Sequence, residues 1–333
     1  MNGICGARSD SMRQMMALAI LTVGILVQPV AGMAQTTGAW EAIVAAAKKE
    51  GRLTLYAAAS TPITDRLKAD FEKAVPGITL EVQSGTSGAI AAKLDAERNL
   101  NVDGADMTII TELVWFDARD KDGSLKTPVG PAAAAWPAAF MRGSNTIPIL
   151  ALEPLIIAYN TNLVKTPITG YQDLLRPEFK GRFATNTLAA TTVIAWYEWL
   201  EKTFGSEFTA KLAAQQPRMY AGTMQSTQST AAGEVVATIY SIPGIAIPMS
   251  ERGAPIKIVY PNPSFGVRYG GAVLGWAKRP NAAQVFMNYV MTVRGQVAWT
   301  GPSGGTASAL PNIPHTVDAK SINPYDPAQY PPE

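Results

Sequence analysis

The chain has 333 residues, of which 47% are hydrophobic, and its formal net charge is +2 at pH 7. It contains one cysteine, Cys5, and one histidine, His315. This composition excludes a multi-histidine zinc site and a disulfide within the chain, and the near-neutral charge without a basic cluster argues against nucleic acid as a partner. A Ser-His-Asp triad would have to use His315, which lies in a proline-rich tail.

The first predicted element is a removable export signal. A short basic stretch at residues 12–14 precedes an apolar run over residues 15–27. Small residues before Gln35 then form a cleavage site, so we expect residues 1–34 to be a signal peptide. The apolar run is too short for a comfortable membrane span. Cleavage would remove Cys5 and leave a soluble protein in the periplasm of a bacterium.

Helix and strand patterns alternate over the next part of the chain. Apolar positions at helical spacing predict helices at 40–50, 63–74 and 89–99, and short apolar runs predict strands at 53–58, 78–82 and 105–110. This alternation predicts a parallel α/β sheet. Its ligand contacts should lie at the carboxyl ends of the strands, where the helices begin.

Later elements suit a second α/β lobe. The extended run over residues 147–159 is interrupted at Glu153-Pro154 and suits a segment that crosses between lobes. The other expected elements are helices at 191–204 and 281–294 and strands at 235–240, 256–260 and 270–277. The last 30 residues are rich in glycine and proline, which predicts coil on the surface.

Several short motifs occur in an order that is found in one family of binding proteins. They are Lys48-Lys49-Glu50-Gly51, Leu53-Thr54-Leu55-Tyr56, Ser84-Gly85-Thr86-Ser87-Gly88, Ala105-Asp106-Met107, Ala158-Tyr159-Asn160-Thr161-Asn162, Phe179-Lys180-Gly181-Arg182, Glu251-Arg252-Gly253-Ala254-Pro255 and Asn281-Ala282-Ala283. Together they resemble the substrate-binding proteins of ABC importers, in the group that includes ferric-iron, thiamine and phosphonate binders.

The resemblance implies the fold of a type II periplasmic binding protein, in which two α/β lobes are joined by a hinge and clamp a ligand between them. It also implies a monomer whose partner is an ABC permease in the inner membrane. We expect residues 35–145 to form mainly lobe 1, and residues 146–255 to form mainly lobe 2. Residues 256–300 would then return to lobe 1, and 301–333 would form the tail.

A metal ligand set is not apparent in the sequence. The ferric members of this group carry two adjacent tyrosines after a Gly-Glu pair, whereas Gly233-Glu234 is followed here by Tyr240-Ser241. Several iron binders also offer a histidine in the first binding loop, where this chain has Ser60-Thr61. We therefore predict no metal and no cofactor, and ferric iron remains the alternative ligand.

Hydroxyls and backbone amides at helix starts are the main candidate ligand contacts. Helix N-termini carry partial positive charge and free N–H donors, which favours carboxylate or phosphonate-like groups. The candidates from these loops are Ser60, Thr61, Ser84, Gly85, Thr86, Ser87 and Thr187.

Three larger side chains complete the candidate site. Arg268 lies within residues 266–271, a stretch that the resemblance places in a loop near the cleft, where a guanidinium would make a bidentate contact with a carboxylate. A salt bridge on the surface or between the lobes is the alternative role. Tyr240 and Tyr269 would offer a ring face or a hydroxyl, with packing in the core as the alternative.

We therefore expect a periplasmic solute-binding protein that captures a small organic anion for a permease. An enzyme is not expected, because nothing in the sequence places the carboxylates of Glu112 and Glu153 together as an acid and base. A scavenger or chemosensory protein that presents its ligand to a different membrane partner is the alternative.

Overall fold

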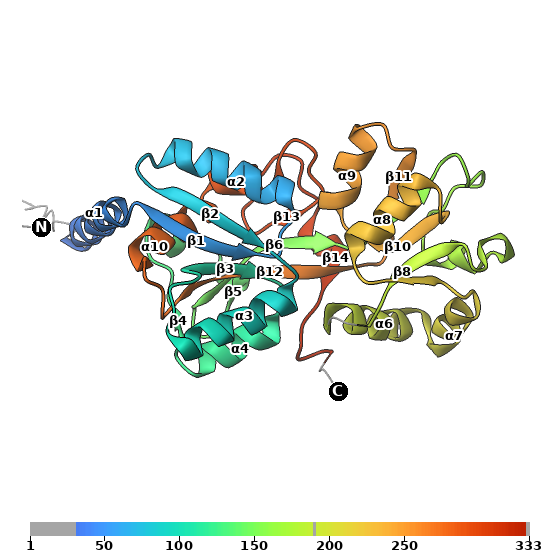
Figure 1. The fold of residues 1–333 in the computed structure, drawn as a ribbon, viewed down its shortest axis with the longest axis horizontal. Helices are drawn as coiled ribbons and strands as arrows, with labels where there is room; N and C mark the ends of the chain where they lie inside the picture. The colour runs from blue at the N-terminus through green and yellow to red at the C-terminus, as the bar shows by residue number, and fades with distance from the viewer. Residues whose placement is uncertain (1–30, 189–190, 331–333) are drawn as a thin grey trace, which may run out of the picture.

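The computed structural model describes residues 31–188 and 191–330. Most of the expected signal peptide, residues 1–30, lies outside the described residues, and the first described element is helix α1, Ala31–Glu50. Within the described ranges, no helix is long and apolar enough to cross a membrane. The chain forms two sheets that lie side by side, each covered by helices on both faces (Figure 1).

The first sheet contains nine strands within the described residues, and its main path runs β13-β6-β12-β3-β1-β2. β1 pairs in parallel with β2 and β3, as the alternation of helices and strands predicted, whereas β12 runs antiparallel to β3 and β6. The strands are β1 (Arg52–Ala57), β2 (Thr79–Ser84), β3 (Met107–Ile110), β4 (Leu125–Lys126), β5 (Met141–Arg142), β6 (Ile147–Pro154), β12 (Ser264–Leu274), β13 (Ala307–Ser308) and β14 (Ile322–Pro324).

The second sheet contains five strands in the described part of the chain, in the order β11-β7-β10-β8-β9. β10 is parallel to β8 and antiparallel to β7. The strands are β7 (Ile156–Asn160), β8 (Phe183–Asn186), β9 (Arg218–Tyr220), β10 (Ala237–Ser241) and β11 (Ile256–Val259). We call the half of the molecule around the first sheet lobe 1 and the half around the second sheet lobe 2.

Helices cover both sheets (Figure 1). In lobe 1 they are α1, α2 (Thr61–Ala74), α3 (Ser87–Leu100), α4 (Leu113–Lys121), α5 (Pro131–Ala134), α10 (Pro280–Val290) and α11 (Val293–Thr300). In lobe 2 they are α6 (Thr191–Phe204), α7 (Ser206–Ala214), α8 (Thr223–Ala232) and α9 (Pro243–Glu251). Short 3-10 turns are at Ala138–Phe140, Tyr171–Leu175, Pro177–Phe179 and Ala319–Ser321.

The chain passes between the lobes through extended segments. β6 ends at Pro154 in the first sheet, and β7 begins at Ile156 in the second, so a single residue separates the two. That residue, Leu155, donates its amide to the Phe265 carbonyl at 2.7 Å. The predicted crossing segment over residues 147–159 is therefore confirmed. The chain returns between β11 and β12.

One apolar core extends under both sheets. It includes Leu94 and Phe116 from lobe 1 and Trp196 and Trp199 from lobe 2, all almost fully buried. Tyr171 contacts both tryptophan rings, with centroids 5.9 and 6.0 Å apart. The aromatic face of the helix predicted at residues 191–204 is therefore packing surface in lobe 2.

The stretch around Arg268 is a strand, which corrects our expectation of a loop there. β12 begins at Ser264 and includes the glycines at 266, 270 and 271. These glycines permit close packing rather than a turn. A Cβ on Gly266 would lie 2.8 Å from the Glu153 carbonyl oxygen, and one on Gly270 would lie 2.7 Å from the Phe116 ring.

Two expectations for the C-terminal third were also wrong. The helix expected over residues 281–294 ends at Val290, and a second helix starts at Val293 after a cap in which the Thr292 hydroxyl accepts from the Gly295 amide. The tail is not only coil, because β13 pairs with β6 and β14 pairs with β12. The tail completes the lobe 1 sheet.

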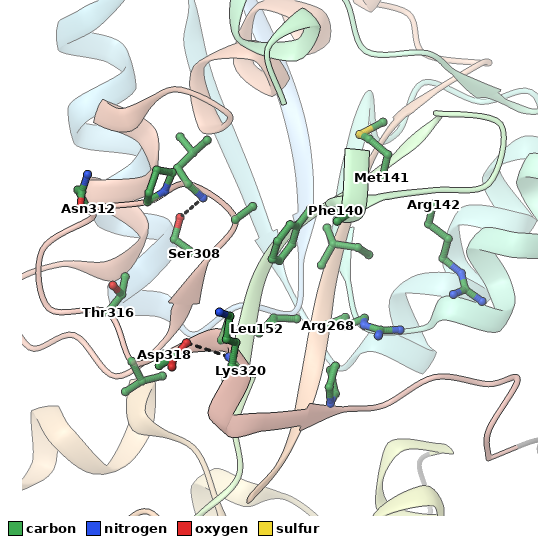
Figure 2. Close-up of a pocket in the computed structure, with 18 of the residues that line it drawn as sticks. Phe140, Met141, Arg142, Leu152, Arg268, Ser308, Asn312, Thr316, Asp318 and Lys320 are labelled. Carbon is green, nitrogen blue, oxygen red and sulfur yellow. Dashed lines mark hydrogen bonds between the residues drawn. The ribbon is translucent and has the colours of Figure 1, made fainter. Parts of the chain in front are cut away.

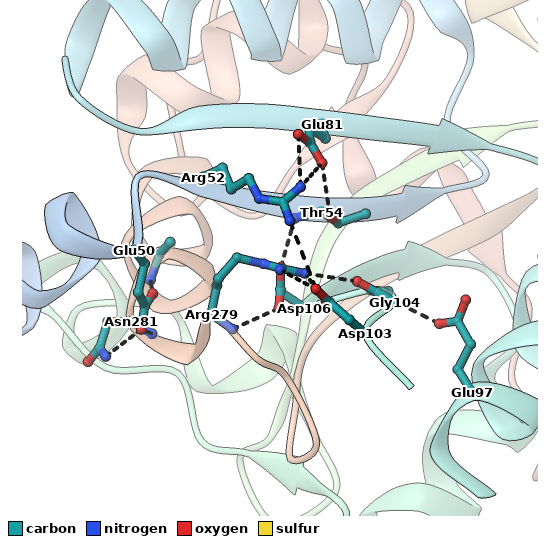
Figure 3. A network of polar contacts seen from close by, with 12 residues as sticks. Glu50, Arg52, Thr54, Glu81, Glu97, Asp103, Gly104, Asp106, Arg279 and Asn281 are labelled. Carbon is teal, nitrogen blue, oxygen red and sulfur yellow. Dashed lines mark hydrogen bonds and ion pairs between the residues drawn. The ribbon is translucent and has the colours of Figure 1, made fainter. Parts of the chain in front are cut away.

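A polar network ties the start of α10 to the lobe 1 sheet (Figure 3). Asp106 is fully buried and accepts from the Arg279 side chain at 2.7 Å and from the Thr54 amide at 2.8 Å. Arg279 also pairs with Asp103, at 2.9 Å between Nη1 and Oδ2. A second, exposed pair joins Arg52 to Glu81 at 2.9 Å.

Candidate ligand-binding pocket between the lobes

A cavity of about 400 Å³ lies between the two lobes at the carboxyl ends of their strands. Lobe 1 supplies residues that follow β2 and β3, and lobe 2 supplies residues at and after the ends of β8 and β9, together with Tyr240 near the end of β10. Its lining consists of Thr86, Ser87, Gly88, Ala89, Thr111, Glu112, Asn186, Thr187, Thr192, Val193, Ala221, Gly222, Thr223 and Tyr240. We call this cavity the interlobe pocket. None of these lining residues is lysine, arginine or histidine.

The lobe 1 wall is the first turn of α3. Its N-cap residue, Thr86, makes no side-chain cap hydrogen bond. The first amide of the helix that finds a backbone acceptor is Ile90, which donates to the Thr86 carbonyl at 3.0 Å. The preceding amides at Ser87, Gly88 and Ala89 belong to residues that line the pocket, so they are available to a ligand.

The Ser87 hydroxyl joins α3 to the end of β3. It accepts from the Thr111 amide at 3.0 Å and lies 2.9 Å from the Thr111 hydroxyl. These bonds hold the first turn of α3 against the strand end and fix where its free amides point.

The lobe 2 wall contains the first turn of α8. Gly222 is its N-cap and has no side chain with which to cap the helix. The Thr223 hydroxyl accepts from the Asn186 side-chain amide at 2.9 Å, and the Thr187 amide donates to the Tyr220 carbonyl at 2.9 Å. The ends of β8 and β9 are thereby held beside the α8 N-terminus, which faces the pocket from the opposite side to α3.

Glu112 is the carboxylate of the pocket. It precedes α4 and is half-buried, and burial raises the pKa of its carboxyl group while the Thr191 hydrogen bond lowers it. The Thr191 hydroxyl, in the first turn of α6, donates to Glu112 Oε2 at 3.0 Å. Because these residues belong to different lobes, this hydrogen bond joins the two lobes beside the pocket.

Tyr240 forms part of the lobe 2 wall and is nearly fully buried. Its ring packs edge-on against Trp196, with centroids 5.2 Å apart. Burial raises the pKa of the Tyr240 phenol to about 12, which a hydrogen bond with Thr192 partly opposes. The phenol is therefore neutral at physiological pH and serves as a hydrogen-bonding group rather than an anion.

Four of the residues that the sequence indicated line this pocket, namely Thr86, Ser87, Thr187 and Tyr240. Ser84 and Gly85 are exposed at the end of β2 and are not part of the lining. Ser60 and Thr61 start α2, which is also outside the lining. The Ser60 hydroxyl oxygen is buried without a hydrogen-bond partner and faces α9, since a Cβ on Gly244 would lie 3.0 Å from it.

Arg268 and Tyr269 lie elsewhere. Arg268 lines a different cavity, beside the tail, together with Arg142 (Figure 2). Both guanidinium groups contact Asp326, at 3.3 Å from Arg268 and 3.5 Å from Arg142. Tyr269 is buried in lobe 1 and donates its hydroxyl to Glu153. Arg268 thus takes the salt-bridge role that was the alternative in the sequence.

Sequence reasoning missed most of the pocket lining. The residues that it did not select as ligand contacts are Gly88, Ala89, Thr111, Glu112, Asn186, Thr192, Val193, Ala221, Gly222 and Thr223. Thr111 and Glu112 follow directly after β3, so the rule that ligands bind at the carboxyl ends of strands was a sufficient signal for them. Gly222-Thr223 is a small-residue helix start of the same kind as Thr86-Ser87. The strand before it, β9, is too short to give a recognisable apolar pattern in the sequence, so this helix start was not predicted.

In the described parts of the chain, no group of three or more histidine, cysteine, aspartate and glutamate side chains is arranged to hold a metal ion. The tyrosine that follows Gly233-Glu234 is part of the pocket, and the next residue is Ser241, fully buried, whose hydroxyl lies 2.8 Å from that of Thr227.

Three solved structures with this fold share 18–20% sequence identity with the chain. A substrate-binding protein of an ABC transporter from Agrobacterium tumefaciens gives a TM-score of 0.73 at 18% identity, over 84% of this chain and 88% of that one. AfuA from Actinobacillus pleuropneumoniae, with fructose 6-phosphate bound, gives 0.66 at 20% identity over 83% and 91%. Iron-bound HitA from Pseudomonas aeruginosa gives 0.65 at 18% identity over 78% and 87%.

A search of curated protein sequences found no match. The family model described as bacterial extracellular solute-binding protein matches residues 53–301, which include the second sheet, most of the first sheet and the interlobe pocket. The chain belongs to the family of bacterial extracellular solute-binding proteins.

Proposed function

We propose that this protein is the periplasmic binding component of an ABC import system and that it captures a small organic anion in the interlobe pocket. It acts as a binding protein and not as an enzyme. The anionic group is a carboxylate, a phosphonate or a phosphate, and the contacts come from both lobes.

One observation carries this proposal. The uncapped N-termini of α3 in lobe 1 and α8 in lobe 2 open into the same pocket. Each offers free backbone N–H donors and partial positive charge, which favour a negatively charged oxygen over a neutral or cationic group. Threonine and serine hydroxyls on both walls add further donors. A cationic ligand would require a cage of acidic or aromatic side chains, which this lining does not provide.

The two-lobe arrangement also suggests how binding is signalled. A ligand that contacts α3 and α8 together makes its full set of hydrogen bonds only when the lobes are close, so it shifts the equilibrium between open and closed forms toward closure. The extended segments between β6 and β7 and between β11 and β12 are the places where a hinge would bend. The closed form would then dock on the permease.

A thermal-shift screen tests the proposal. The purified protein, without residues 1–34, is melted in the presence of L-malate, succinate, phosphate, methylphosphonate, fructose 6-phosphate, putrescine, glucose and ferric citrate. A ligand at 100 times its Kd adds about 2.7 kcal/mol to stability, so binding is detectable as a rise in melting temperature. We expect stabilisation by anions only, because the N-termini of α3 and α8 favour negatively charged oxygens. If putrescine or glucose gave the only shift, the proposed ligand class would be wrong.

Ferric iron is a second candidate, favoured by one observation. Glu112 and Tyr240, two side chains that carry hard oxygen donors, line the same pocket. Iron-bound HitA has the same fold. The raised pKa of Tyr240 and the serine at position 241 make this the weaker candidate, because Fe(III) would have to displace the proton of a deeply buried phenol.

The membrane partner separates transport from sensing. Permease and ATPase genes next to the gene for this protein, together with loss of uptake when it is deleted, would support import. A neighbouring sensor kinase with intact uptake would support the chemosensory alternative.

A further inference from the structure

The interlobe pocket combines many hydrogen-bond donors with one carboxylate, and the position of that carboxylate restricts the ligand. Glu112 follows β3 and reaches into the pocket from lobe 1. Its Oε2 atom accepts from the Thr191 hydroxyl of lobe 2 at 3.0 Å. One of its two oxygens therefore already has a partner across the pocket.

The other oxygen, Oε1, faces the first turn of α3. A Cβ placed on Gly88 would lie 4.0 Å from this atom, and the absence of a side chain there leaves the space beside it open. Among the described residues, Glu112 takes part in no ion pair, and the hydrogen bond from Thr191 is the one that its side chain makes. Oε1 is thus an acceptor without a donor in the wall of a ligand pocket.

An ionised carboxylate only accepts hydrogen bonds, whereas the threonine and serine hydroxyls around it both donate and accept. A ligand whose polar atoms are all acceptors, such as a fully deprotonated oxyanion, would bring like charge against Glu112. A ligand with an O–H or N–H beside its anionic group would satisfy Oε1 and keep its negative oxygens at the α3 and α8 N-termini. Once a ligand shields Oε1 from water, leaving this acceptor unpaired would cost about 1–3 kcal/mol, which is enough to discriminate between ligands with and without a donor.

We infer that Glu112 is a specificity-determining residue that selects anions carrying a hydrogen-bond donor next to the charged group, such as hydroxy acids, sugar phosphates and singly protonated phosphates or phosphonates. This inference rests on the proposed function and narrows its ligand class. The hydrogen bond from the Thr191 hydroxyl joins this carboxylate to lobe 2.

Matched pairs of anions test the inference, because their members differ in the donor alone. L-malate has a hydroxyl that succinate lacks, and hydrogen phosphate has a proton that sulfate lacks at pH 7. Titration calorimetry with the protein lacking residues 1–34 should give at least tenfold tighter binding of the donor-bearing member of at least one pair. In Glu112→Gln, whose amide can itself donate to an oxyanion, that preference should fall at least fivefold.

Thr191→Val is the matched control, because it removes the interlobe hydrogen bond and leaves the carboxylate in place. It should weaken both members of a pair by a similar factor and keep the preference. Thermal melts without ligand show whether each variant is folded.

The outcomes separate the two proposals. If anions bind but malate equals succinate and phosphate equals sulfate, the inference is wrong and the proposed function stands. The same holds if Glu112→Gln, like Thr191→Val, weakens both members equally, since Glu112 would then be only a structural link between the lobes. If no anion binds the wild-type protein, the proposed function fails and this inference falls with it.

Discussion

The Tyr269 hydroxyl donates a 2.8 Å hydrogen bond to Glu153 Oε2 and so joins β12 to β6, the two long strands next to the passages between the lobes. The other carboxylate oxygen accepts a longer bond, of 3.4 Å, from the Gly244 amide in the first turn of α9. The Glu153 side chain is fully buried, and neither donor carries a charge. Burial raises the pKa of this carboxyl group to about 7, although both hydrogen bonds oppose the rise.

This pKa predicts a loss of stability between acidic and neutral pH. In the unfolded chain a glutamate titrates near pH 4.3, so the folded state holds the Glu153 proton more tightly. The stabilisation is fully present below about pH 4 and is lost as the pH rises through about 7. It amounts to at most about 4 kcal/mol between these limits.

Urea denaturation at about pH 5.5 and pH 8 measures this loss. The free energy of unfolding should fall for the wild-type protein and change less for Glu153→Gln, which is neutral at both pH values. Equal changes in the two proteins would show that Glu153 does not titrate in this range.

The Arg279 network predicts that Arg279→Ala strongly lowers the free energy of unfolding. Arg279→Ala would leave the Asp106 carboxylate buried with only amide donors, and breaking one side of a buried ion pair typically costs about 3–5 kcal/mol. Arg52→Ala is the matched control, because its pair with Glu81 is exposed and exposed pairs contribute less than about 1 kcal/mol. Equal losses in chemical denaturation would contradict this view of the network.

The close packing of β12 predicts that Gly266 does not tolerate a side chain. A Cβ there would clash with the Ile322 side chain and lie 2.8 Å from the Glu153 carbonyl oxygen, so Gly266→Ala should displace β14 and lower the free energy of unfolding by about 1–3 kcal/mol. Gly170→Ala is the control, since its Cβ would approach no atom closer than 4.0 Å. A stability of Gly266→Ala equal to that of the control would argue against the pairing of β14 with β12.

The ferric alternative has a spectroscopic test. Protein loaded with ferric citrate should not develop the visible absorption band of tyrosinate bound to iron, because the pocket presents Tyr240 with its pKa raised to about 12 and no adjacent second tyrosine. A strong band that disappears in Tyr240→Phe would establish iron as a ligand.

The sequence was sufficient to predict the local architecture of lobe 1. The β-loop-α pattern through Ser84–Gly88 depends on short-range signals, namely apolar periodicity and small residues at helix starts, and these predicted both the parallel strands and Thr86 and Ser87 in the pocket. The crossing at Glu153-Pro154 could also be predicted from the sequence, because a proline has no backbone N–H to donate within a sheet.

The remainder depends on contacts that are distant in the chain. The resemblance placed the stretch around Arg268 in a loop, but it is a strand whose glycines allow close packing against Phe116 and Ile322, which no local pattern reveals. The Thr191 hydrogen bond to Glu112 joins residues 79 positions apart and forms only once two lobes have folded and docked. Most of the pocket lining was therefore missed even though the fold was correctly predicted.

A binding titration of Gly222→Leu tests most directly whether the ligand binds in the interlobe pocket. The backbone of Gly222 is extended, with φ −158°, and its Cβ would meet nothing within 4 Å, so a leucine there should fold normally and enter the interlobe pocket beside the α8 N-terminus. Gly170→Leu is the control, at an extended glycine that is not part of the pocket lining.

Titration calorimetry is performed with the anion that stabilises the wild-type protein most in the thermal-shift screen. We predict at least tenfold weaker binding for Gly222→Leu and wild-type affinity for Gly170→Leu. Wild-type affinity in a folded Gly222→Leu protein would contradict the account, because the anion would then bind outside the pocket between the lobes.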